Sequence, residues 1–349
     1  MDKYGRLVIF DASPYGCQEF SKNVCKYLNV SLSSCKVEKF KDGETNIIIE
    51  DSVRGADVFV FQSYTPPIGE RKYELELLLD AIVHGGGANR VHVVLPFLFG
   101  SRGKRRTRAR QPIPTLVFGK SMRGRGVHGI VTVDVHTTVI GSLYNALDLG
   151  FENLQFEFIV ANIIMTKTKD MNQIVLCSAD IGGAKKIKKV RDIIAQETNI
   201  LLPVALADKY RPQPNVSEIN TIIGDVKGKT VYLIDDMGDT MGSIKSAAKA
   251  YKEQGAEKIY VILCHPVLGE GSEERLKQIF DEDLVEEIIF GDTIPLKDFT
   301  KNYPKIKRVP LEPFVGEAIR RIHEDISISG LHKYDQIMST YQRLNLEGF

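Results

Sequence analysis

Short apolar runs alternate with amphipathic stretches along this chain, and the alternation restricts its fold more than any other feature. Runs such as Val58–Phe61 and Val231–Ile234 have the length and continuous apolarity of strands buried on both faces. Helical patterns separate the runs, for example at Gln18–Leu28, Lys72–His84 and Gly242–Glu253. Strand–helix alternation predicts an α/β protein with largely parallel sheets. Because the pattern runs twice, we expect two similar α/β domains.

Composition fits two ordinary domains and narrows the choice of partners. The chain has 349 residues, 43% of them hydrophobic, and a net charge of +1. Balanced charge gives no reason to expect nucleic acid or a membrane as a partner, and no apolar run approaches the ~20 residues of a membrane span. The five cysteines include no C-x-x-C pair, so we expect a reducing, cytoplasmic setting. The stretch Tyr210–Asn220 holds two prolines among polar residues and is predicted to be an exposed loop.

The segment Val231–Ile244, VYLIDDMGDTMGSI, carries the most chemical information. An apolar strand ends in two adjacent acids, Asp235 and Asp236, and a short polar loop then opens a helix. In open α/β sheets, ligands bind beyond the carboxyl ends of the strands. A helix N-terminus offers unpaired N–H groups to a phosphate, and carboxylates accept hydrogen bonds from sugar hydroxyls. The segment predicts a sugar-phosphate site; the alternative is a helix N-cap rich in Asp, Thr and Ser.

This loop resembles the ribose-5-phosphate loop of phosphoribosyltransferase-type domains, and it is most similar to the form found in ribose-phosphate pyrophosphokinases. In that family the paired acids bind the ribose hydroxyls and the loop holds the 5-phosphate. The resemblance implies that ribose 5-phosphate is bound by Asp235, Asp236, Asp239, Thr240, Met241, Gly242 and Ser243. Two positions depart from the family pattern: Gly238 replaces a branched aliphatic residue, and Met241 replaces a small one.

Phe40-Lys-Asp-Gly-Glu44 is similar to a Phe-x-Asp-Gly-Glu motif of the same family. The resemblance implies that Phe40 stacks on the adenine of ATP, with Asp42 and Glu44 close by. Taken alone, the motif is more typical of a charged turn that is anchored by its Phe.

The segment Leu95–Ile113 aligns with a family segment that clamps adenine and contacts the triphosphate. Arg102 matches the clamping arginine, whereas Gly103 and Lys104 replace a usual Gln-Asp pair, so we assign all three to ATP binding by resemblance. Six of the nine residues 102–110 are Lys or Arg, which favours a polyanionic ligand such as ATP. The alternatives are a solvated basic loop or a nucleic-acid patch, and the lack of interleaved aromatic residues opposes the latter.

Three further segments resemble the parts of the family that handle metal and phosphate. In Thr132-Val-Asp-Val-His136 the resemblance makes His136 a magnesium ligand, although a histidine at a strand end is more often structural. In Ser178-Ala-Asp-Ile-Gly-Gly183 it makes Asp180 the partner magnesium ligand, which also lies at the ribose-5-phosphate site. Mg²⁺ prefers oxygen ligands and keeps several waters, so such a sparse site is plausible. In Ala207-Asp-Lys-Tyr-Arg211 it implies that Lys209 and Arg211 close over the transferring phosphorus, as catalytic residues together with His136.

The resemblance implies a ribose-phosphate diphosphokinase, which transfers the β,γ-pyrophosphate of ATP to the C1 hydroxyl of ribose 5-phosphate. It also implies a homo-oligomer, and the family often forms hexamers. We predict an ATP-binding and oligomerisation domain at 1–155 and a ribose-5-phosphate domain at 156–311. We expect a C-terminal helix within 312–331 to pack back on the first domain, followed by a tail, 332–349, without an assigned role. Two alternatives stay open: a non-catalytic homologue that regulates a partner synthetase, and a phosphoribosyltransferase that uses the product as substrate.

Overall fold

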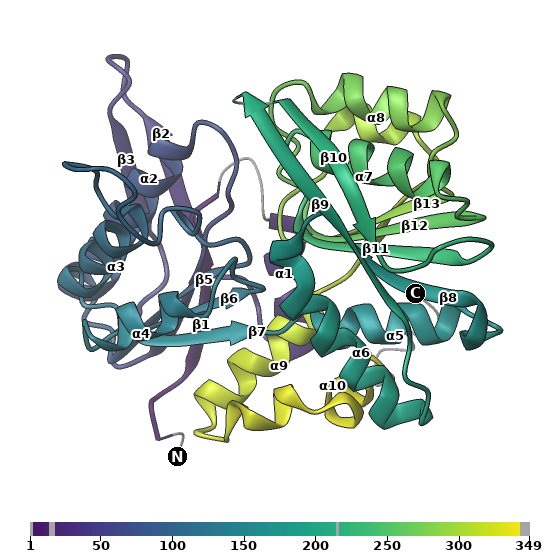
Figure 1. Ribbon diagram of the computed structural model, residues 1–349. Coiled ribbons are helices and arrows are strands. Elements are labelled where there is room, and N and C mark those ends of the chain that lie inside the picture. The colour runs from purple at the N-terminus through teal and green to yellow at the C-terminus, as the bar shows by residue number, and fades with distance from the viewer. Residues whose placement is uncertain (1–2, 14–17, 214–215, 343–349) are drawn as a thin grey trace. The chain divides into compact units, whose positions relative to one another are not determined.

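The computed structural model describes residues 3–13, 18–213 and 216–342, with the side chains of 209–220 and 342 excepted (Figure 1). These residues form two compact units. The first unit comprises residues 3–155, 293–295 and 311–342, and the second comprises residues 156–292 and 296–310, within the described ranges. Each unit has its own buried hydrophobic core built around one sheet.

The sheet of the first unit is parallel throughout. Its strands, in spatial order, are β1 (Leu7–Asp11), β4 (Asp57–Phe61), β5 (Arg90–Leu95), β6 (Gly129–Val133) and β7 (Gly150–Leu154). All five residues of β4 and of β6 are buried, as expected of central strands covered on both faces. The connecting helices are α1 (Gln18–Leu28), α2 (Ile68–Asp80), α3 (Pro114–Gly124) and α4 (Val139–Asn145). The predicted helix Lys72–His84 is α2 followed by a π-helical turn, Ala81–Gly85.

A separate two-stranded hairpin belongs to the same unit. Its antiparallel strands are β2 (Cys35–Lys39) and β3 (Thr45–Ile49), and Lys39 lies opposite Thr45. The turn between them is closed by the N–H of Phe40, which donates to the Glu44 carbonyl at 2.8 Å. Gly43 has φ of +93°, a conformation that glycine adopts without strain. The Phe-Lys-Asp-Gly-Glu motif is therefore the tip of a hairpin.

The C-terminal helices complete the first unit. Helix α9 (Glu312–His323) packs on α1, where the Tyr27 hydroxyl donates to Glu317 and the Asn23 amide donates to Glu312, both at 2.9 Å. Two arginines of α9 also bind Glu317, and these hydrogen bonds hold the pKa of Glu317 down at about 2 despite its burial. Helix α10 (Tyr334–Gln342) contacts α9 in turn.

The sheet of the second unit has seven strands. Their spatial order is β10 (Val216–Ile223), β9 (Val204–Gln213), β8 (Ile174–Ser178), β11 (Thr230–Met237), β12 (Lys258–His265), β13 (Glu287–Gly291) and β14 (Ile306–Val309). Every pair is parallel except β9 with β10. The described helices include α5 (Glu157–Lys167), α6 (Ala184–Thr198), α7 (Gly242–Glu253) and α8 (Ser272–Asp281). These parallel sheets and interleaved helices confirm the predicted fold class.

Strand order in the second unit creates a natural binding position. The chain runs from β8 through α6 outward to β9, whereas it runs from β11 through α7 in the opposite direction to β12. The loops after β8 and β11 therefore diverge at the carboxyl ends of two neighbouring strands. Such a topological switch point leaves room for a ligand between the two loops.

The prediction of a loop at Tyr210–Asn220 is wrong, and its predicted exposure falls outside the described part of the structure. Most of that stretch lies in β9 and β10, which pair antiparallel; residues 214 and 215 fall outside the described part of the chain. Proline supplies no N–H to a ladder, which is why Pro212 suggested a loop. The register shifts between Val216 and Glu218, opposite that segment of β9, so Pro212 falls where the ladder is interrupted.

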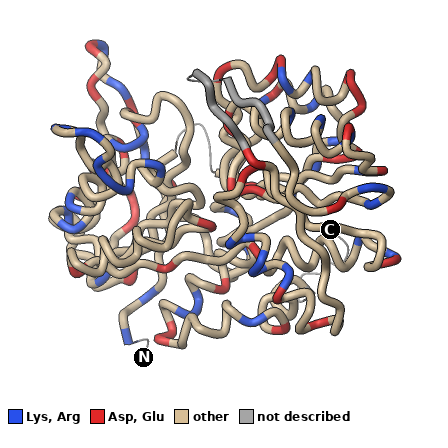
Figure 2. The backbone as a smooth tube through the Cα atoms, in the orientation of Figure 1, with Lys and Arg blue, Asp and Glu red and all other residues tan. Residues whose placement is uncertain are grey.

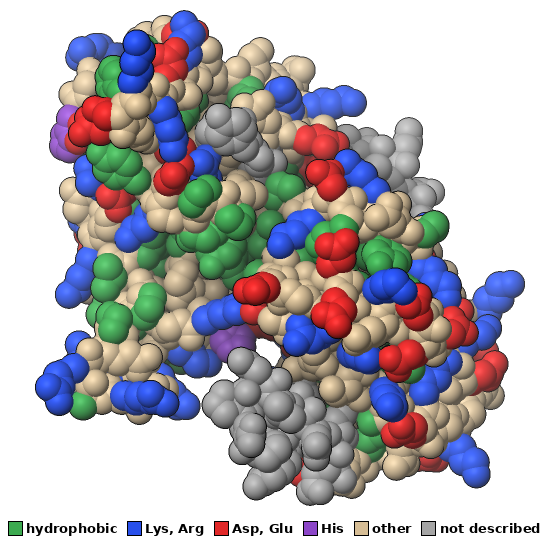
Figure 3. Space-filling model, turned by 90° about the horizontal axis from the view of Figure 1, so that it is seen from above, with side chains coloured by type: hydrophobic (Ala, Val, Ile, Leu, Met, Phe, Trp, Pro, Cys, Tyr) green, Lys and Arg blue, Asp and Glu red, His purple; other side chains and the backbone are tan. Residues whose placement is uncertain are grey.

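Charged side chains of both signs are interspersed on the face in Figure 3, in keeping with the balanced composition. Across the described residues, no helix has both the length and the apolarity that crossing a membrane requires.

Candidate functional site

The predicted sugar-phosphate loop lies at the switch point of the second unit. Strand β11 continues through Asp235 and Asp236 to Met237, and α7 begins at Gly242. Met241, the residue before the helix, has φ of +62° and ψ of 1°, a left-handed conformation that turns the chain sharply into α7. The first N–H groups of α7 have no acceptor within the helix, so this end presents donors and a positive dipole to an anion.

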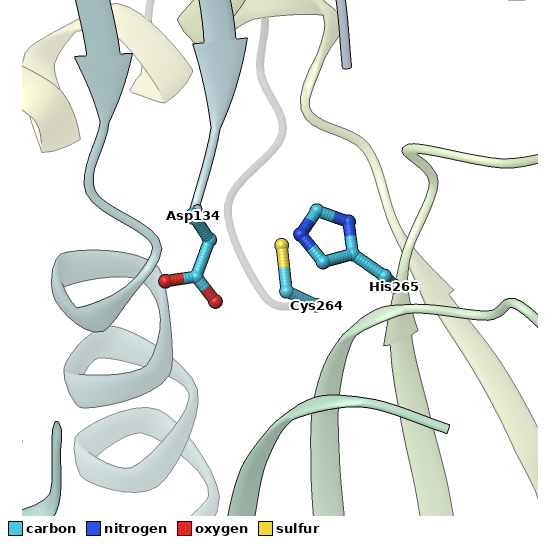
Figure 4. A group of neighbouring side chains, drawn as sticks. All are labelled: Asp134, Cys264 and His265. Atoms are coloured by element: carbon cyan, nitrogen blue, oxygen red, sulfur yellow. The ribbon is translucent and has the colours of Figure 1, made fainter. Parts of the chain in front are cut away.

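The segment after β12 holds the loop from one side. The Gly238 N–H donates to the His265 carbonyl at 2.9 Å, and the N–H of Leu268 donates back to Gly238 at 2.8 Å. Gly269 donates to the Asp239 carbonyl at 3.0 Å. Figure 4 shows Cys264 and His265 where β12 ends. The loop is thus bonded through its backbone to the neighbouring strand connection, which keeps its shape without a ligand.

The residues at positions 238 and 241 are matched in size. The Met241 side chain is 2% exposed and packs over Gly238, where an added Cβ would lie only 2.7 Å from the Met241 sulfur. The two departures from the family pattern are therefore complementary, because the side chain missing at 238 is replaced by the larger one at 241.

The acid pair has the electrostatics of a binding site. Burial, and after it the negative charges of Asp236 and Asp180, raise the pKa of Asp235 to about 7. The Asp236 N–H donates to the Asp235 carboxylate at 2.9 Å and opposes that shift. A carboxyl group with a pKa raised by its neighbours is typical of functional sites, since a hydrogen-bond donor or cation there relieves the repulsion.

Asp180 follows β8, the strand paired with β11, so the structure brings it to the same sheet edge as the acid pair. Its carboxylate accepts a hydrogen bond from the Gly183 N–H at 3.2 Å, and its carbonyl accepts one from the Ser178 hydroxyl at 2.6 Å. Gly183 is required for this turn, because an added Cβ would lie 2.0 Å from the Ser178 oxygen. The carboxylate is therefore oriented before any ligand arrives.

Lys209 and Arg211 lie on β9, where Lys209 is opposite Ile219 of β10. Their side chains fall outside the described part of the structure, so their roles stay predictions.

The predicted ATP residues of the first unit lie on two loops. Phe40 is 55% exposed at the hairpin tip, so it does not anchor the turn in the core. Asp42 and Glu44 are also exposed, and the Asp42 carboxylate accepts the Glu44 N–H at 3.1 Å. An exposed aromatic ring suits stacking on a base.

The basic loop follows β5, and its Lys and Arg positions are blue in Figure 2. One side chain organises the loop. The amide oxygen of Gln111 accepts from the N–H and hydroxyl of Thr107 and from the N–H of Arg108, at 2.9 to 3.2 Å. Gly103 packs against Pro114, where an added Cβ would lie 2.4 Å from the ring. Arg102 is exposed and Lys104 is half-buried. The loop has a defined backbone that presents cationic side chains to solvent.

His136 lies in the turn after β6 and is exposed rather than packed in the core. The turn begins at the buried Asp134, which Figure 4 shows directly after the strand and whose φ is +47°. The Val135 N–H donates to the Asn153 side chain at 3.0 Å. This exposure removes the main alternative for His136, that of a buried structural histidine.

Two residues that the sequence did not indicate contribute to these loops. Gln111 shapes the basic loop, and Arg275 of α8 donates to the Thr240 carbonyl in the phosphate loop at 3.2 Å. Arg275 could have been suspected only from the strand order, which places the connection after β12 beside the loop after β11.

Together, the folds and loops define a chain with phosphoribosyltransferase-type architecture and an acid-pair phosphate loop. Residues 8–126 match the family profile described as the N-terminal domain of ribose phosphate pyrophosphokinase, and residues 188–333 match the phosphoribosyl synthetase-associated domain. A ribose-phosphate pyrophosphokinase of Corynebacterium ammoniagenes is 34% identical over 90% of this chain and 94% of its own length. The enzyme of that name from Bacillus subtilis is 32% identical over 95% of this chain and 98% of its own.

A solved structure supports the same assignment. The crystal structure of phosphoribosylpyrophosphate synthetase from Mycobacterium smegmatis is similar, with a TM-score of 0.81 and 28% identity, over 92% of this chain and 99% of the other. The chain belongs to the ribose-phosphate pyrophosphokinase family.

Proposed function

We infer that this chain is a ribose-phosphate diphosphokinase, which joins the β,γ-pyrophosphate of ATP to the C1 oxygen of ribose 5-phosphate and releases AMP. The observation that carries the inference is the acid-pair phosphate loop at the switch point of the second unit, in a chain of this family. The exposed Phe40 hairpin and the basic loop of the first unit favour this activity over a phosphoribosyltransferase, which needs neither.

We propose that ribose 5-phosphate binds in the second unit. The N–H groups at the start of α7, with the hydroxyls of Thr240 and Ser243, bind the 5-phosphate. Asp235 and Asp236 accept hydrogen bonds from the ribose hydroxyls. Binding of donors beside Asp235 favours its charged form, because it offsets the burial that raises its pKa to about 7.

ATP binding is assigned to the first unit. Phe40 and Arg102 hold the adenine by stacking, with Asp42 and Glu44 near the base. Lys104 and its basic neighbours attract the triphosphate, which carries several negative charges. Gly103 packs on Pro114, so its departure from the family pattern is accommodated within the loop.

The donor set suits magnesium on the substrate phosphates. Asp180 has a carboxylate oriented by Gly183, and His136 is exposed, so each can contribute one ligand atom while water and phosphate oxygens supply the rest. Bound there, Mg²⁺ would neutralise phosphate charge and orient the group that is transferred.

Transfer itself requires positioning and charge stabilisation. The C1 oxygen approaches the β-phosphorus in line with the departing oxygen of AMP. Lys209 and Arg211 stabilise the charge that develops on the transferring group.

We also propose that the chain is cytoplasmic and that it forms a homo-oligomer. Measurement of its size in solution tests the oligomeric state directly.

The decisive assay measures AMP formed from ATP and Mg²⁺ with and without ribose 5-phosphate. We expect ribose-dependent AMP release, and we expect Lys209→Ala to lower the rate by roughly 100-fold or more while ribose 5-phosphate binding is nearly unchanged. Lys277→Ala is the matched control, because Lys277 is an exposed lysine paired with Asp281 on α8. A folded chain that binds ribose 5-phosphate but releases no AMP would instead support the regulatory homologue.

A further inference from the structure

Arg275 is a cationic side chain that reaches the phosphate loop from another helix. It lies in the first turn of α8, and its guanidinium donates from Nη1 to the carbonyl oxygens of Thr240 and Gly271, each at 3.2 Å. One bond therefore ends on the phosphate loop, and the other ends on the residue that precedes α8. The two segments are joined through a single side chain.

Glycines of two segments lie beside the Arg275 side chain. An added Cβ on Gly271 would lie 2.7 Å from the Arg275 Nη1, and Gly271 has φ of +76°, so a larger residue is disfavoured there for two reasons. At Gly242, the first residue of α7, an added Cβ would lie 3.5 Å from the Arg275 Nε. The guanidinium thus runs alongside the first turn of the helix that receives the phosphate.

The bond to Thr240 orients the donors of the loop. A peptide unit is planar and trans, so its C=O and N–H point in opposite directions. When Arg275 holds the Thr240 carbonyl toward α8, the N–H of Met241 must point away from α8. The same bond pairs a carbonyl oxygen whose partial negative charge would otherwise oppose an incoming phosphate.

We propose that Arg275 is a positioning residue for the 5-phosphate of ribose 5-phosphate: it fixes the direction of the loop peptides from α8 and adds a positive charge beside them. This inference rests on the proposed function of the loop. It assigns Arg275 no contact with the reacting atoms, so its effect falls on sugar-phosphate binding and not on ATP binding or on the chemical step.

The test compares Arg275→Met, Arg275→Lys and the control Lys277→Met in the full chain. For Arg275→Met we expect the KM for ribose 5-phosphate to rise about tenfold, equivalent to about 1.4 kcal/mol, with kcat and the KM for ATP within about twofold of wild type. Lysine keeps the charge and can still donate, but its flexible ammonium lacks the fixed planar geometry of the guanidinium, so Arg275→Lys should recover only part of the loss. Lys277→Met removes a lysine of α8 that pairs with Asp281 and should leave both KM values unchanged.

Calorimetric titration with ribose 5-phosphate, and separately with ribose, gives a second readout. We expect Arg275→Met to weaken ribose 5-phosphate binding and to leave the much weaker ribose binding unchanged. Equal rises in both KM values, an unchanged KM for ribose 5-phosphate, or full recovery by lysine would overturn the positioning role. A wild-type chain that binds ribose 5-phosphate without releasing AMP would refute the proposed activity alone. If the wild type did not bind ribose 5-phosphate, both the proposed activity and the positioning role of Arg275 would be overturned.

Discussion

Replacing Gly238 by valine should destabilise the second unit unless Met241 is shortened in the same chain. Gly238 does not have a positive φ, so its backbone accepts a β-branched residue. Its surroundings do not, because the new Cβ alone would lie 2.7 Å from the Met241 sulfur, 3.0 Å from Phe290 and 3.1 Å from Leu263. Overpacking of this kind costs about 1–3 kcal/mol.

Met241→Ala should be destabilising for the opposite reason. The methionine is 2% exposed within the hydrophobic core, so truncation leaves a cavity that costs about 2–5 kcal/mol. Alanine and methionine suffer the same backbone strain at φ of +62°, so that contribution cancels. In the double variant, valine occupies part of the space that methionine leaves, and we expect it to be more stable than the summed single effects by about 1–3 kcal/mol.

Urea unfolding of the full chain, followed by circular dichroism with and without ribose 5-phosphate, measures this coupling. Affinity for ribose 5-phosphate should fall in Gly238→Val and recover in the double variant, since the loop regains its shape. The control pair combines Gly238→Val with Met122→Ala, because Met122 is buried in the core of the other unit and should give additive effects. Additivity of the 238 and 241 substitutions within about 0.5 kcal/mol would refute the reasoning.

Three further predictions concern single features. Asp235→Ala combined with Asp236→Ala should weaken ribose 5-phosphate binding at least tenfold more than ATP binding; equal losses in titrations would contradict the assignment. Phe40→Ala should raise the KM for ATP roughly tenfold, because stacking is lost, and should leave the KM for ribose 5-phosphate unchanged. Initial-rate kinetics can check both values. Burial raises the pKa of Asp11 from 3.8 to about 6, so its neutral form stabilises the fold below pH 4, and that contribution is lost as the pH rises through about 6. The loss is up to about 3 kcal/mol, and Asp11→Asn should reduce it. If the free energies of unfolding of the wild type and of Asp11→Asn, measured in urea, changed in parallel between pH 4 and 7, this role of Asp11 would be ruled out.

Local sequence patterns were sufficient to predict much of the fold. The helices Gln18–Leu28 and Gly242–Glu253 have the predicted bounds, and the buried strands β4 and β11 contain the predicted apolar runs. The phosphate loop was also recognisable, because an acid pair, a polar turn and a helix start are consecutive in the chain. Each of these features depends on neighbours within a few residues, and periodicity and turn chemistry report such neighbours reliably.

Other features depend on partners far away in the chain. The stretch around Pro212 is part of a strand because β10 pairs with Tyr210 and Gln213 on either side of it, although its composition is typical of a loop. Met241 fills the space over Gly238, and Arg275 reaches Thr240 from α8, only because of the order in which the strands assemble. The raised pKa of Asp235 likewise follows from burial and, in part, from Asp180, which lies just beyond the end of the neighbouring strand β8. Packing, burial and charge are properties of atoms close in space, and a linear pattern carries no record of which distant residues will become neighbours.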